Sequence, residues 1–254
     1  YEPYLFYANQ VPLGGMALKN SMGYLFLTII SSVLLFSSCS ADSENEASSI
    51  PRLGTAEIAE NQLLRLNLFT EPASLDPRKI NDTTSALVVK MLFEGLTRIQ
   101  PNGLPGPAIA EEIEISEDLK TYRFTIRDCN WSDGTPLTAY DFAYTWKEVL
   151  SPTFDAPYAM QMYVIKNAQK AKAGEVTLDE IGVRAINKKT LQVTLENPTP
   201  YFLELTAFPT FFPVNRRISE EDPSWANESS KNFISNGPFS LDTWRHHNEL
   251  IVEK

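Results

Sequence analysis

A run of uncharged, mostly apolar residues near the N-terminus sets where the folded part of this chain begins. The run extends from Tyr24 to Phe36 and follows Lys19 and the first methionine, Met16. A transmembrane helix needs about 20 apolar residues, so this run is short for a membrane span. It has the length and the basic flank of an export signal. We therefore expect the folded part of the chain to lie downstream of it.

The end of this run carries a cysteine in a setting typical of lipidated exported proteins. The sequence Phe36–Ser37–Ser38–Cys39 resembles a lipoprotein cleavage box, in which small residues admit the signal peptidase and the cysteine thiol accepts a diacylglycerol. Leucine is more usual where Phe36 stands. The alternative is a plain secretory signal, cut nearby, in which Cys39 is incidental. We expect lipidation because the cysteine directly follows the run.

The residues around this box differ in character from a folded domain. Ser40–Ser49 has no hydrophobic period and suits a flexible tether between lipid and domain. No signal pattern is found upstream of Met16. The sequence therefore predicts residues 1–15 as a non-native upstream extension, residues 16–38 as a lipoprotein signal peptide and residues 39–60 as a flexible tether.

The composition narrows the classes of partner. Hydrophobic residues make up 43% of the chain and charged residues 21%, the balance of a folding globular protein. The 32 acidic residues exceed the 22 basic ones and give a formal net charge of -10. This excess disfavours nucleic acid as a partner, because binding to phosphates needs lysine and arginine.

The cysteines give no sign of a metal site. Cys39 and Cys129 are the two cysteines, and neither lies in a pattern with metal-ligand spacing. The sequence therefore predicts no metal and no cofactor. If Cys39 is lipidated, Cys129 has no partner for an intramolecular disulfide, and we expect it to be a buried thiol.

Several segments have the patterns of β-strands. Leu64–Leu68, Tyr122–Ile126 and Leu191–Leu195 alternate apolar and polar residues with the period of two that a strand burying one face requires. Asn236–Phe239 is expected to punctuate two strands. A further strand is expected to begin at Leu250 without its partners.

Helical spacing is found in two segments. From Ser85 onward four apolar residues fall on one helical face, and Gly95 is placed to end that helix in the left-handed conformation. These apolar residues are Leu87, Val88, Met91 and Leu92. Thr138 is expected to cap a second helix together with Asp141. The buried stripe of that helix is predicted as Phe142, Trp146, Val149 and Leu150.

Aromatic residues gather toward the end of the chain. Pro198–Pro200 is expected to open a short helix, and Phe208, Phe211 and Phe212 follow it. Such a concentration is a ligand platform in some proteins but is more commonly core, and we assign it to the core. The alternation of strands with helices predicts a mixed α/β or α+β architecture.

Catalytic motifs are missing from the sequence. It has no glycine-rich phosphate loop, no GxSxG elbow and no HExxH motif. His246 and His247 are its only histidines. They are either a pH-sensitive or metal-touching pair or part of a solvated turn between strands, and we favour the turn. The chain is therefore predicted not to be an enzyme.

One long block resembles a known family. Ala108–Trp146, which includes the turn sequence Trp131–Pro136, closely resembles the signature block of oligopeptide-binding proteins of ABC importers. Shorter motifs recur in the family's order and spacing, namely Leu75–Pro77, Leu92–Leu96, Ser151–Pro152, Pro157–Ala159, Ile181–Val183, Pro200–Phe202 and Asn236–Phe239. The resemblance covers residues 61–254 of this chain, and these residues resemble only the N-terminal portion of the family's proteins.

The resemblance implies a fold. Family members are periplasmic-binding-protein-like clamshells of the large peptide-binding type, with a mixed α+β architecture, and the clamshell would be incomplete here. Residues 61–94 and 216–254 would be parts of the main lobe, and residues 95–215 would be an inserted smaller domain. The C-terminal lobe would be absent, because family members are much longer than this chain.

The resemblance also implies site residues. The family's cleft grips an extended peptide through its backbone groups. Asn81 and Thr83 fall where the family lines the cleft beside the peptide backbone, and Tyr158 falls where the smaller lobe contributes an aromatic ring. From the residues alone, Asn81 and Thr83 are equally loop residues that satisfy local backbone groups. Trp131–Pro136 is interpreted as a scaffold turn.

The function implied is capture of short peptides for delivery to the permease and ATPase subunits of an ABC importer. The protein would be a monomer, anchored to the cell membrane through lipid and facing the periplasm or the cell exterior. Two alternatives stay open. One is a relative that binds nickel, haem, a sugar or another small solute, and the other is a truncated remnant that does not bind.

Overall fold

The computed structural model of this protein describes residues 64–227 and 233–254. Residues 65–254 form one compact unit. The predicted extension, signal peptide and tether, together with Cys39, lie outside the described residues. The division of residues 61–254 into lobes stays a prediction. Within the described part of the chain, no helix has both the length and the apolar character needed to cross a bilayer.

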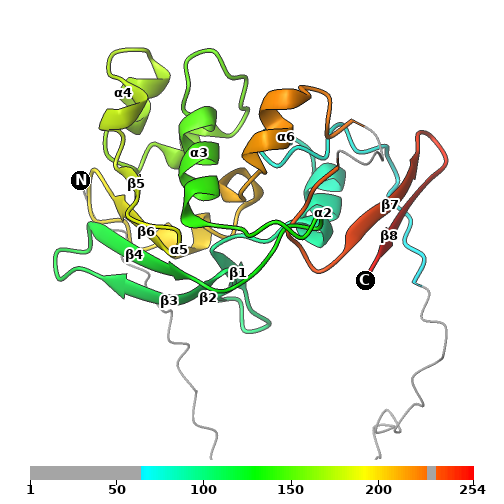
Figure 1. Ribbon diagram of the computed structural model, residues 1–254, viewed down its shortest axis with the longest axis horizontal. Coiled ribbons are helices and arrows are strands. Elements are labelled where there is room, and N and C mark those ends of the chain that lie inside the picture. The colour runs from blue at the N-terminus through cyan, green and yellow to red at the C-terminus, as the bar shows by residue number, and fades with distance from the viewer. Residues whose placement is uncertain (1–63, 228–232) are drawn as a thin grey trace, which may run out of the picture. The chain divides into compact units, whose positions relative to one another are not determined.

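The described residues form a mixture of helices and antiparallel strands (Figure 1). The helices are α2 (Thr83–Leu92), α3 (Ala139–Val149), α4 (Ala168–Lys172), α5 (Phe202–Leu205) and α6 (Arg216–Glu221), with short 3-10 helices at Ala159–Met162, Leu178–Glu180 and Pro209–Phe211. The strands are β1 (Thr97–Ile99), β2 (Pro105–Pro107), β3 (Ala110–Ile115), β4 (Thr121–Ile126), β5 (Val183–Ala185), β6 (Thr190–Thr194), β7 (Ser240–Arg245) and β8 (Glu249–Glu253).

A four-stranded antiparallel sheet with the order β3-β4-β6-β5 forms the largest sheet of the described residues. Tyr122 of β4 lies opposite Val193 of β6, and Phe124 lies opposite Leu191. All four side chains are buried on one face of the sheet. The predicted strands at 122–126 and 191–195 are confirmed, because their period-two patterns bury one face as expected.

Helix α3 packs its predicted stripe onto this sheet. One carboxylate oxygen of Asp141 accepts hydrogen bonds from the Thr138 N–H (2.8 Å) and the Thr138 hydroxyl (2.9 Å), so the predicted capping box is confirmed. Burial raises the pKa of Asp141 despite these two bonds. Phe142 and Trp146 are fully buried, and burying a side chain such as Phe142 stabilises the fold by about 1.5–3 kcal/mol.

Helix α2 differs from its prediction at two residues. Leu87 was expected on the buried face but is 46% exposed, because the side that packs inward is centred on Val88, Val89 and Leu92. Gly95 does not end the helix in the left-handed conformation, since Phe93 is the C-cap with φ -131. A Cβ at Gly95 would lie 2.5 Å from the Thr206 carbonyl oxygen, so this glycine permits a close approach of two segments.

The strand predicted at Leu64–Leu68 is wrong. These residues form no strand, and Leu66 is 52% exposed. A strand exists only where a neighbouring backbone supplies hydrogen bonds, and no strand of the described residues pairs with this segment. The alternation of leucines was therefore not sufficient to predict the element.

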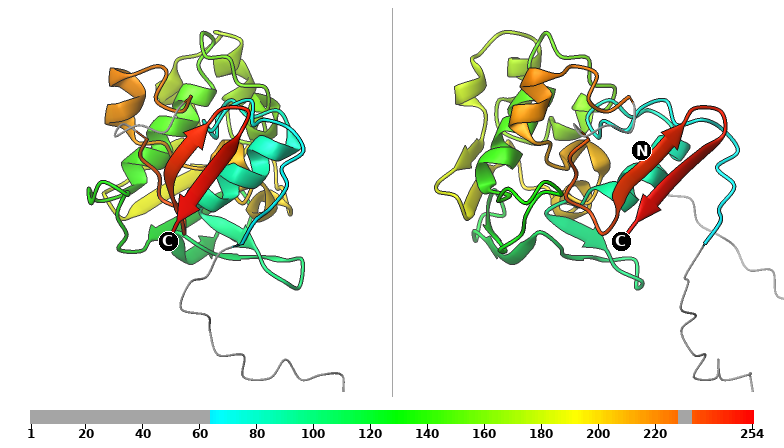
Figure 2. Two further views of the ribbon diagram at one scale, coloured as in Figure 1. Left: turned by 90° about the vertical axis from the view of Figure 1, so that its right-hand side faces the viewer. Right: turned by 45° about the vertical axis from the view of Figure 1, so that its right-hand side comes forward.

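The last two strands form a separate hairpin. β7 pairs with β8 in antiparallel register, with Trp244 opposite Leu250, and the hairpin lies beside α2 (Figures 1 and 2). The strand predicted from Leu250 is confirmed, but it has a partner, contrary to prediction. Asn236–Phe239 precedes β7, and no strand comes directly before it in the described chain, so it does not separate two strands.

Asn236–Phe239 instead joins the hairpin to the end of α2. The Gly237 N–H donates to the Leu92 carbonyl (2.8 Å), and the Asn236 side chain both accepts from the Glu94 N–H (3.2 Å) and donates to the Glu94 carbonyl (3.0 Å). A Cβ at Gly237 would lie 2.4 Å from the Leu92 carbonyl carbon. Only glycine fits this approach without displacing the backbone.

The predicted aromatic core is confirmed for two of its three members. Phe211 and Phe212 are buried, whereas Phe208 is only half-buried. The indole N–H of Trp146 donates to the Phe211 carbonyl (2.8 Å), and the two rings meet edge to face with centroids 5.2 Å apart. Cys129 is a free thiol that is partly rather than fully buried.

Candidate functional site

The loop that leads into α2 exposes two predicted site residues. Asp82 caps the helix by accepting hydrogen bonds from the Ser85 N–H (2.8 Å) and the Ser85 hydroxyl (2.6 Å). Asn81 and Thr83, on either side of this cap, are exposed. Neither of their side chains hydrogen-bonds another residue of the described chain. Both therefore keep their polar groups available to a ligand or to water.

The cap also sets the charge at this point. Burial raises the pKa of Asp82, but hydrogen bonds from Ser85 outweigh that effect, and the net pKa is lowered from its usual value. The carboxylate therefore stays ionised and occupied with the helix. Asn81 itself is neutral, so it offers an amide donor and acceptor rather than a second negative charge.

Helix α2 extends the exposed surface beyond Thr83. Thr83, Leu87 and Lys90 are exposed and lie at helical spacing on one side of the helix. We call these three residues the α2 strip. The strip leads to a hollow of about 310 Å³, whose walls include Lys90, Phe93 and Phe212. The sequence prediction missed this strip, because it assigned Leu87 to the core.

A buried ion pair fixes the loop that carries Asn81. Arg78 donates to both carboxylate oxygens of Asp76, at 2.9 Å and 2.8 Å, and both side chains are 3% exposed. Burial lowers the pKa of Arg78, but Asp76 outweighs burial and the net pKa is raised. A third bond runs from Arg78 to the Ser219 hydroxyl of α6 (2.8 Å). The pair thus ties the loop to α6.

The same arginine brings a second segment to the loop. The guanidinium carbon of Arg78 lies 4.8 Å from the ring centroid of Phe154, and the Lys79 ammonium lies 5.5 Å from it. These are cation–π distances. The segment that begins at Ser151 and includes Tyr158 is therefore held beside the loop before α2.

Tyr158 is half-buried and held by another aromatic ring. Its ring meets that of Phe208 edge to face, with centroids 5.3 Å apart. In the described residues, no hydrogen bond or ring contact joins Tyr158 to Asn81 or Thr83. The link between them is indirect, through Phe154. Phe208 is a residue that the sequence prediction placed in the core, and no spacing signal distinguishes it from its buried neighbours.

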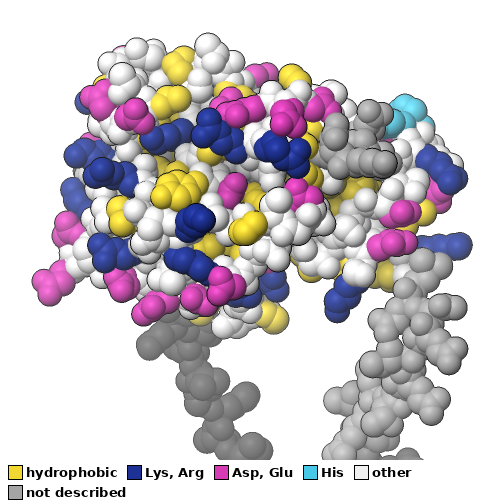
Figure 3. Space-filling model, viewed as in Figure 1, with side chains coloured by type: hydrophobic (Ala, Val, Ile, Leu, Met, Phe, Trp, Pro, Cys, Tyr) yellow, Lys and Arg dark blue, Asp and Glu magenta, His cyan; other side chains and the backbone are white. Residues whose placement is uncertain are grey.

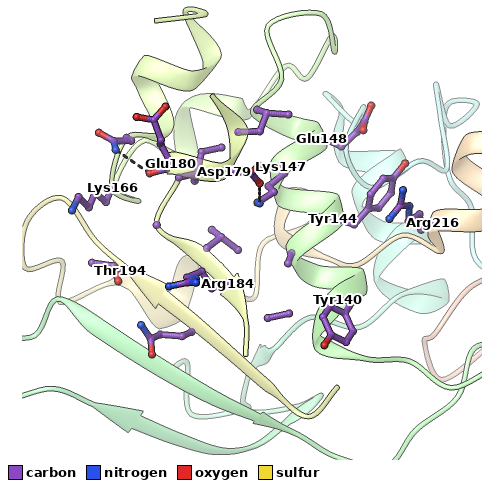
Figure 4. Close-up of a pocket in the computed structure, with 18 residues that line it drawn as sticks. Tyr140, Tyr144, Lys147, Glu148, Lys166, Asp179, Glu180, Arg184, Thr194 and Arg216 are labelled. Carbon is purple, nitrogen blue, oxygen red and sulfur yellow. Dashed lines mark hydrogen bonds and ion pairs between the residues drawn. The ribbon is translucent and has the colours of Figure 1, made fainter. Parts of the chain in front are cut away.

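A larger hollow lies elsewhere. It has a volume of about 1070 Å³ between α3 and the β5 edge and contains none of the predicted site residues (Figure 4). The ammonium of Lys147 lies 2.7 Å from a carboxylate oxygen of Asp179 across it. Tyr140 and Tyr144 line it from successive turns of α3. Its opening is broad, and because none of the predicted site residues lines it, the loop before α2 remains the candidate site.

Acidic and basic side chains are mixed on the face seen in Figure 3. Within residues 64–227 and 233–254, no group of three histidine, cysteine or acidic side chains is placed to hold a metal ion. Burial raises the pKa of the Cys129 thiol, which reduces its reactivity as a nucleophile.

Comparison with known proteins gives matches over most of the described chain. Residues 105–254 match the family model described as bacterial extracellular solute-binding proteins, family 5 Middle. The oligopeptide-binding protein OppA of Bacillus subtilis is 48% identical over 192 residues, which are 75% of this chain and 35% of OppA. The probable deoxycholate-binding periplasmic protein YgiS of Escherichia coli is 38% identical over 201 residues, which are 78% of this chain and 37% of YgiS.

A solved structure resembles this chain as well. Listeria monocytogenes OppA bound to peptide matches with a TM-score of 0.65 and 38% identity, covering 67% of this chain and 34% of that one. The predicted fold class, a mixed helix and sheet fold of the peptide-binding clamshell proteins, is confirmed by this match. The chain spans about a third of the length of the curated relatives that it matches.

Proposed function

Because this chain belongs to family 5 of the bacterial extracellular solute-binding proteins, we propose that it captures short peptides and delivers them to the permease and ATPase subunits of an ABC importer. The family consists of solute-binding proteins rather than enzymes. The relatives named above are oligopeptide-binding or periplasmic proteins, and one solved relative holds a peptide. The peptide ligand, the monomeric state and the importer are proposals for this chain.

The observation that carries the proposal is the pair of free polar side chains at the start of α2. The side chains of Asn81 and Thr83 are exposed and make no hydrogen bond to the described residues. The buried Asp76–Arg78 pair holds their loop in place. Free donors and acceptors on a fixed loop suit a ligand whose backbone amides and carbonyls repeat regularly, as an extended peptide has.

Tyr158 would supply the apolar contact. Its edge-to-face packing on Phe208 fixes the ring, so little conformational entropy is lost when a ligand covers its exposed side. Contacts to the peptide backbone do not depend on the peptide's side chains. We therefore expect broad sequence tolerance, with no preference for basic residues through the neutral Asn81.

Calorimetry with a mixture of tripeptides to pentapeptides tests this proposal. The matched residues are about a third of each relative, so binding is measured up to millimolar peptide. Thr83→Val and Asn81→Ala should each weaken binding roughly three- to tenfold, the loss expected for one hydrogen bond. Tyr158→Ala should weaken it about tenfold, and Tyr158→Phe should keep most of the affinity.

Tyr140→Ala is the matched control, because Tyr140 is an exposed tyrosine in the hollow between α3 and β5. It should leave peptide binding unchanged. Loss of binding in Tyr140→Ala, with none in Thr83→Val or Tyr158→Ala, would move the site to that hollow and contradict the proposal.

A small amphipathic solute is the second candidate, and the similarity to YgiS favours it. Deoxycholate is therefore titrated alongside the peptides. The peptide proposal predicts heat from peptides and none from deoxycholate at equal concentration. The reverse result assigns this chain to the small-solute relatives, and heat from neither supports the non-binding alternative.

Lipid anchoring through Cys39 completes the proposal. It rests on the position of Cys39 after the uncharged run, which lies outside the described residues. Metabolic labelling with an alkyne-bearing fatty acid should mark the wild-type chain and Cys129→Ala but not Cys39→Ala. Equal labelling of Cys39→Ala and wild type would rule out Cys39 as the lipid attachment site.

A further inference from the structure

The β7–β8 hairpin contacts the loop before α2 through a cluster of polar groups that the proposed function does not use. Glu71, at the start of that loop, accepts hydrogen bonds from the Trp244 indole N–H (2.7 Å) and the His247 backbone N–H (3.0 Å). His246 Nδ1 lies 2.9 Å from the same carboxylate oxygen that Trp244 contacts. One carboxylate thus contacts three residues of the hairpin.

The second ring nitrogen of His246 is also engaged. Nε2 lies 3.0 Å from the backbone carbonyl oxygen of Asn227. A carbonyl oxygen only accepts hydrogen bonds, and so does an ionised carboxylate. Both ring nitrogens therefore face acceptors, and each needs a proton to make its bond.

A neutral imidazole carries only one N–H, so neither of its tautomers satisfies both contacts. With the proton on Nε2, the Nδ1 lone pair faces the Glu71 carboxylate. With the proton on Nδ1, the Nε2 lone pair faces the Asn227 carbonyl. Both hydrogen bonds form only when Glu71 and His246 share one proton more than an ionised carboxylate and a neutral imidazole hold.

The surroundings of the ring favour the added positive charge. The Trp244 ring lies against His246 with centroids 4.4 Å apart, and Trp244 is 7% exposed. An indole face attracts a cation. Among the described residues, Glu71 is the acidic side chain that pairs with the ring, and the hairpin's other ion pair, Arg245–Glu249, lies within the hairpin itself.

We propose that Glu71 and His246 form a proton-dependent latch, which holds the β7–β8 hairpin on the loop before α2 in mild acid and weakens as the pH rises through the titration of histidine. A two-stranded hairpin is marginally stable alone, so its seating depends on such contacts. The latch goes beyond the proposed function and does not rest on it.

The lower limit of the latch is set by Glu71. Burial raises the pKa of Glu71, but hydrogen bonds from His247, His246 and Trp244 outweigh this, and the net pKa is lowered from 4.5. Because the pKa of Glu71 is lowered, its stabilising negative charge is present above pH 4.5. The charge is lost as the pH falls through the lowered pKa. The carboxylate side of the latch therefore stays charged down to a pH below 4.5.

Two measurements on the 254-residue chain test the latch. The first is the nitrogen chemical shifts of the His246 ring by NMR, which report protonation at each nitrogen. At about pH 5.5 both nitrogens should carry a proton. A neutral ring at that pH would overturn the proposal, and this measurement needs no variant to fold.

The second measurement is amide hydrogen exchange of the hairpin, corrected for the intrinsic effect of pH. Exchange at Trp244 and Ile251 should be about three- to fivefold slower at pH 5.5 than at pH 8, as suits a half-exposed ion pair. His246→Asn and Glu71→Gln should abolish the difference. His247→Asn, the matched control, should keep it because His247 contacts Glu71 through its backbone. An unchanged pH difference in His246→Asn would contradict the latch.

Discussion

The sheet with α3 and the hairpin with the loop before α2 differ in how far polar contacts add to apolar packing. The first region is apolar, since Phe124, Phe142 and Trp146 are fully buried and interlock around β4 and β6. The second also buries apolar side chains, such as Leu75, Ile80 and Trp244, and adds the Asp76–Arg78 pair and the Glu71 cluster. Leu66, which precedes that loop, and Leu87 of the adjoining α2 are exposed.

This difference separates the part of the molecule that is fixed from the part that is adjustable. Apolar packing contains no titratable group, so it changes little with pH. Ion pairs and hydrogen bonds on a partly exposed hairpin change with pH, salt and single substitutions. The predicted site residues Asn81 and Thr83 belong to the second region, while Tyr158 is packed on the first by Phe208.

The largest effect is expected from removing the centre of the apolar region. Trp146→Ala deletes a fully buried ring and the hydrogen bond to the Phe211 carbonyl, and it should lower the free energy of unfolding by about 3–5 kcal/mol. Urea unfolding followed by circular dichroism measures this loss. Tyr140→Ala on the same helix is 52% exposed and should cost less than about 0.5 kcal/mol. Equal losses would remove the contrast between core and surface.

Arg78→Met tests whether the second region depends on its buried ion pair. It leaves the Asp76 carboxylate buried without its partner, which should cost about 3–5 kcal/mol. The double variant Asp76→Leu with Arg78→Met should recover part of this loss, because no uncompensated charge remains. Urea unfolding of the three proteins gives the comparison, and a double variant less stable than Arg78→Met would contradict the explanation.

A smaller loss is expected where the segment before β7 approaches the end of α2. Gly237→Ala places a Cβ 2.4 Å from the Leu92 carbonyl carbon, and overpacking of this kind costs about 1–3 kcal/mol. Gly103→Ala is the control, since a Cβ there meets nothing within 4 Å but φ is +81. The control should lose about 1 kcal/mol through the left-handed backbone alone. A larger loss for Gly103→Ala than for Gly237→Ala would show that the approach tolerates a methyl group.

Asp82→Ala should give the smallest change, a loss of about 0.5–2 kcal/mol at neutral pH. The pKa of Asp82 is lowered in the folded state, so its contribution to stability is present above pH 3.8. That contribution is lost as the pH falls through the lowered pKa. Wild type and variant should therefore converge in stability in strong acid. If the stability difference between wild type and Asp82→Ala stays constant from neutral pH into strong acid, the charge of Asp82 does not contribute to the stability of the cap.

Local features of the fold could be predicted from the sequence. The strand at Tyr122–Ile126 and the Thr138–Asp141 capping box depend on residues a few positions apart, and both are present. The strand at Leu64–Leu68 failed because a strand needs a partner that the local pattern does not specify. Gly95 was assigned to a helix end, although its role is contact with Thr206 far along the chain.

Less of the candidate site than of the fold could be predicted from the sequence. Asn81, Thr83 and Tyr158 came from the resemblance, since nothing in their own spacing marks them. The exposure of Leu87 depends on which side of α2 meets its neighbours. Glu71 and His246 are 175 positions apart, so their contact needed the structure. The turn predicted at His246 and His247 is confirmed, but its polar partners are not visible in the sequence.

The most direct test of the central claim is a map of backbone amide shifts in the isotope-labelled chain during titration with short peptides. We predict the largest shifts at Asn81, Thr83 and Tyr158, with smaller ones along α2 at Leu87 and Lys90. Shifts confined to the hollow between α3 and β5, or no shifts at millimolar peptide, would contradict the account.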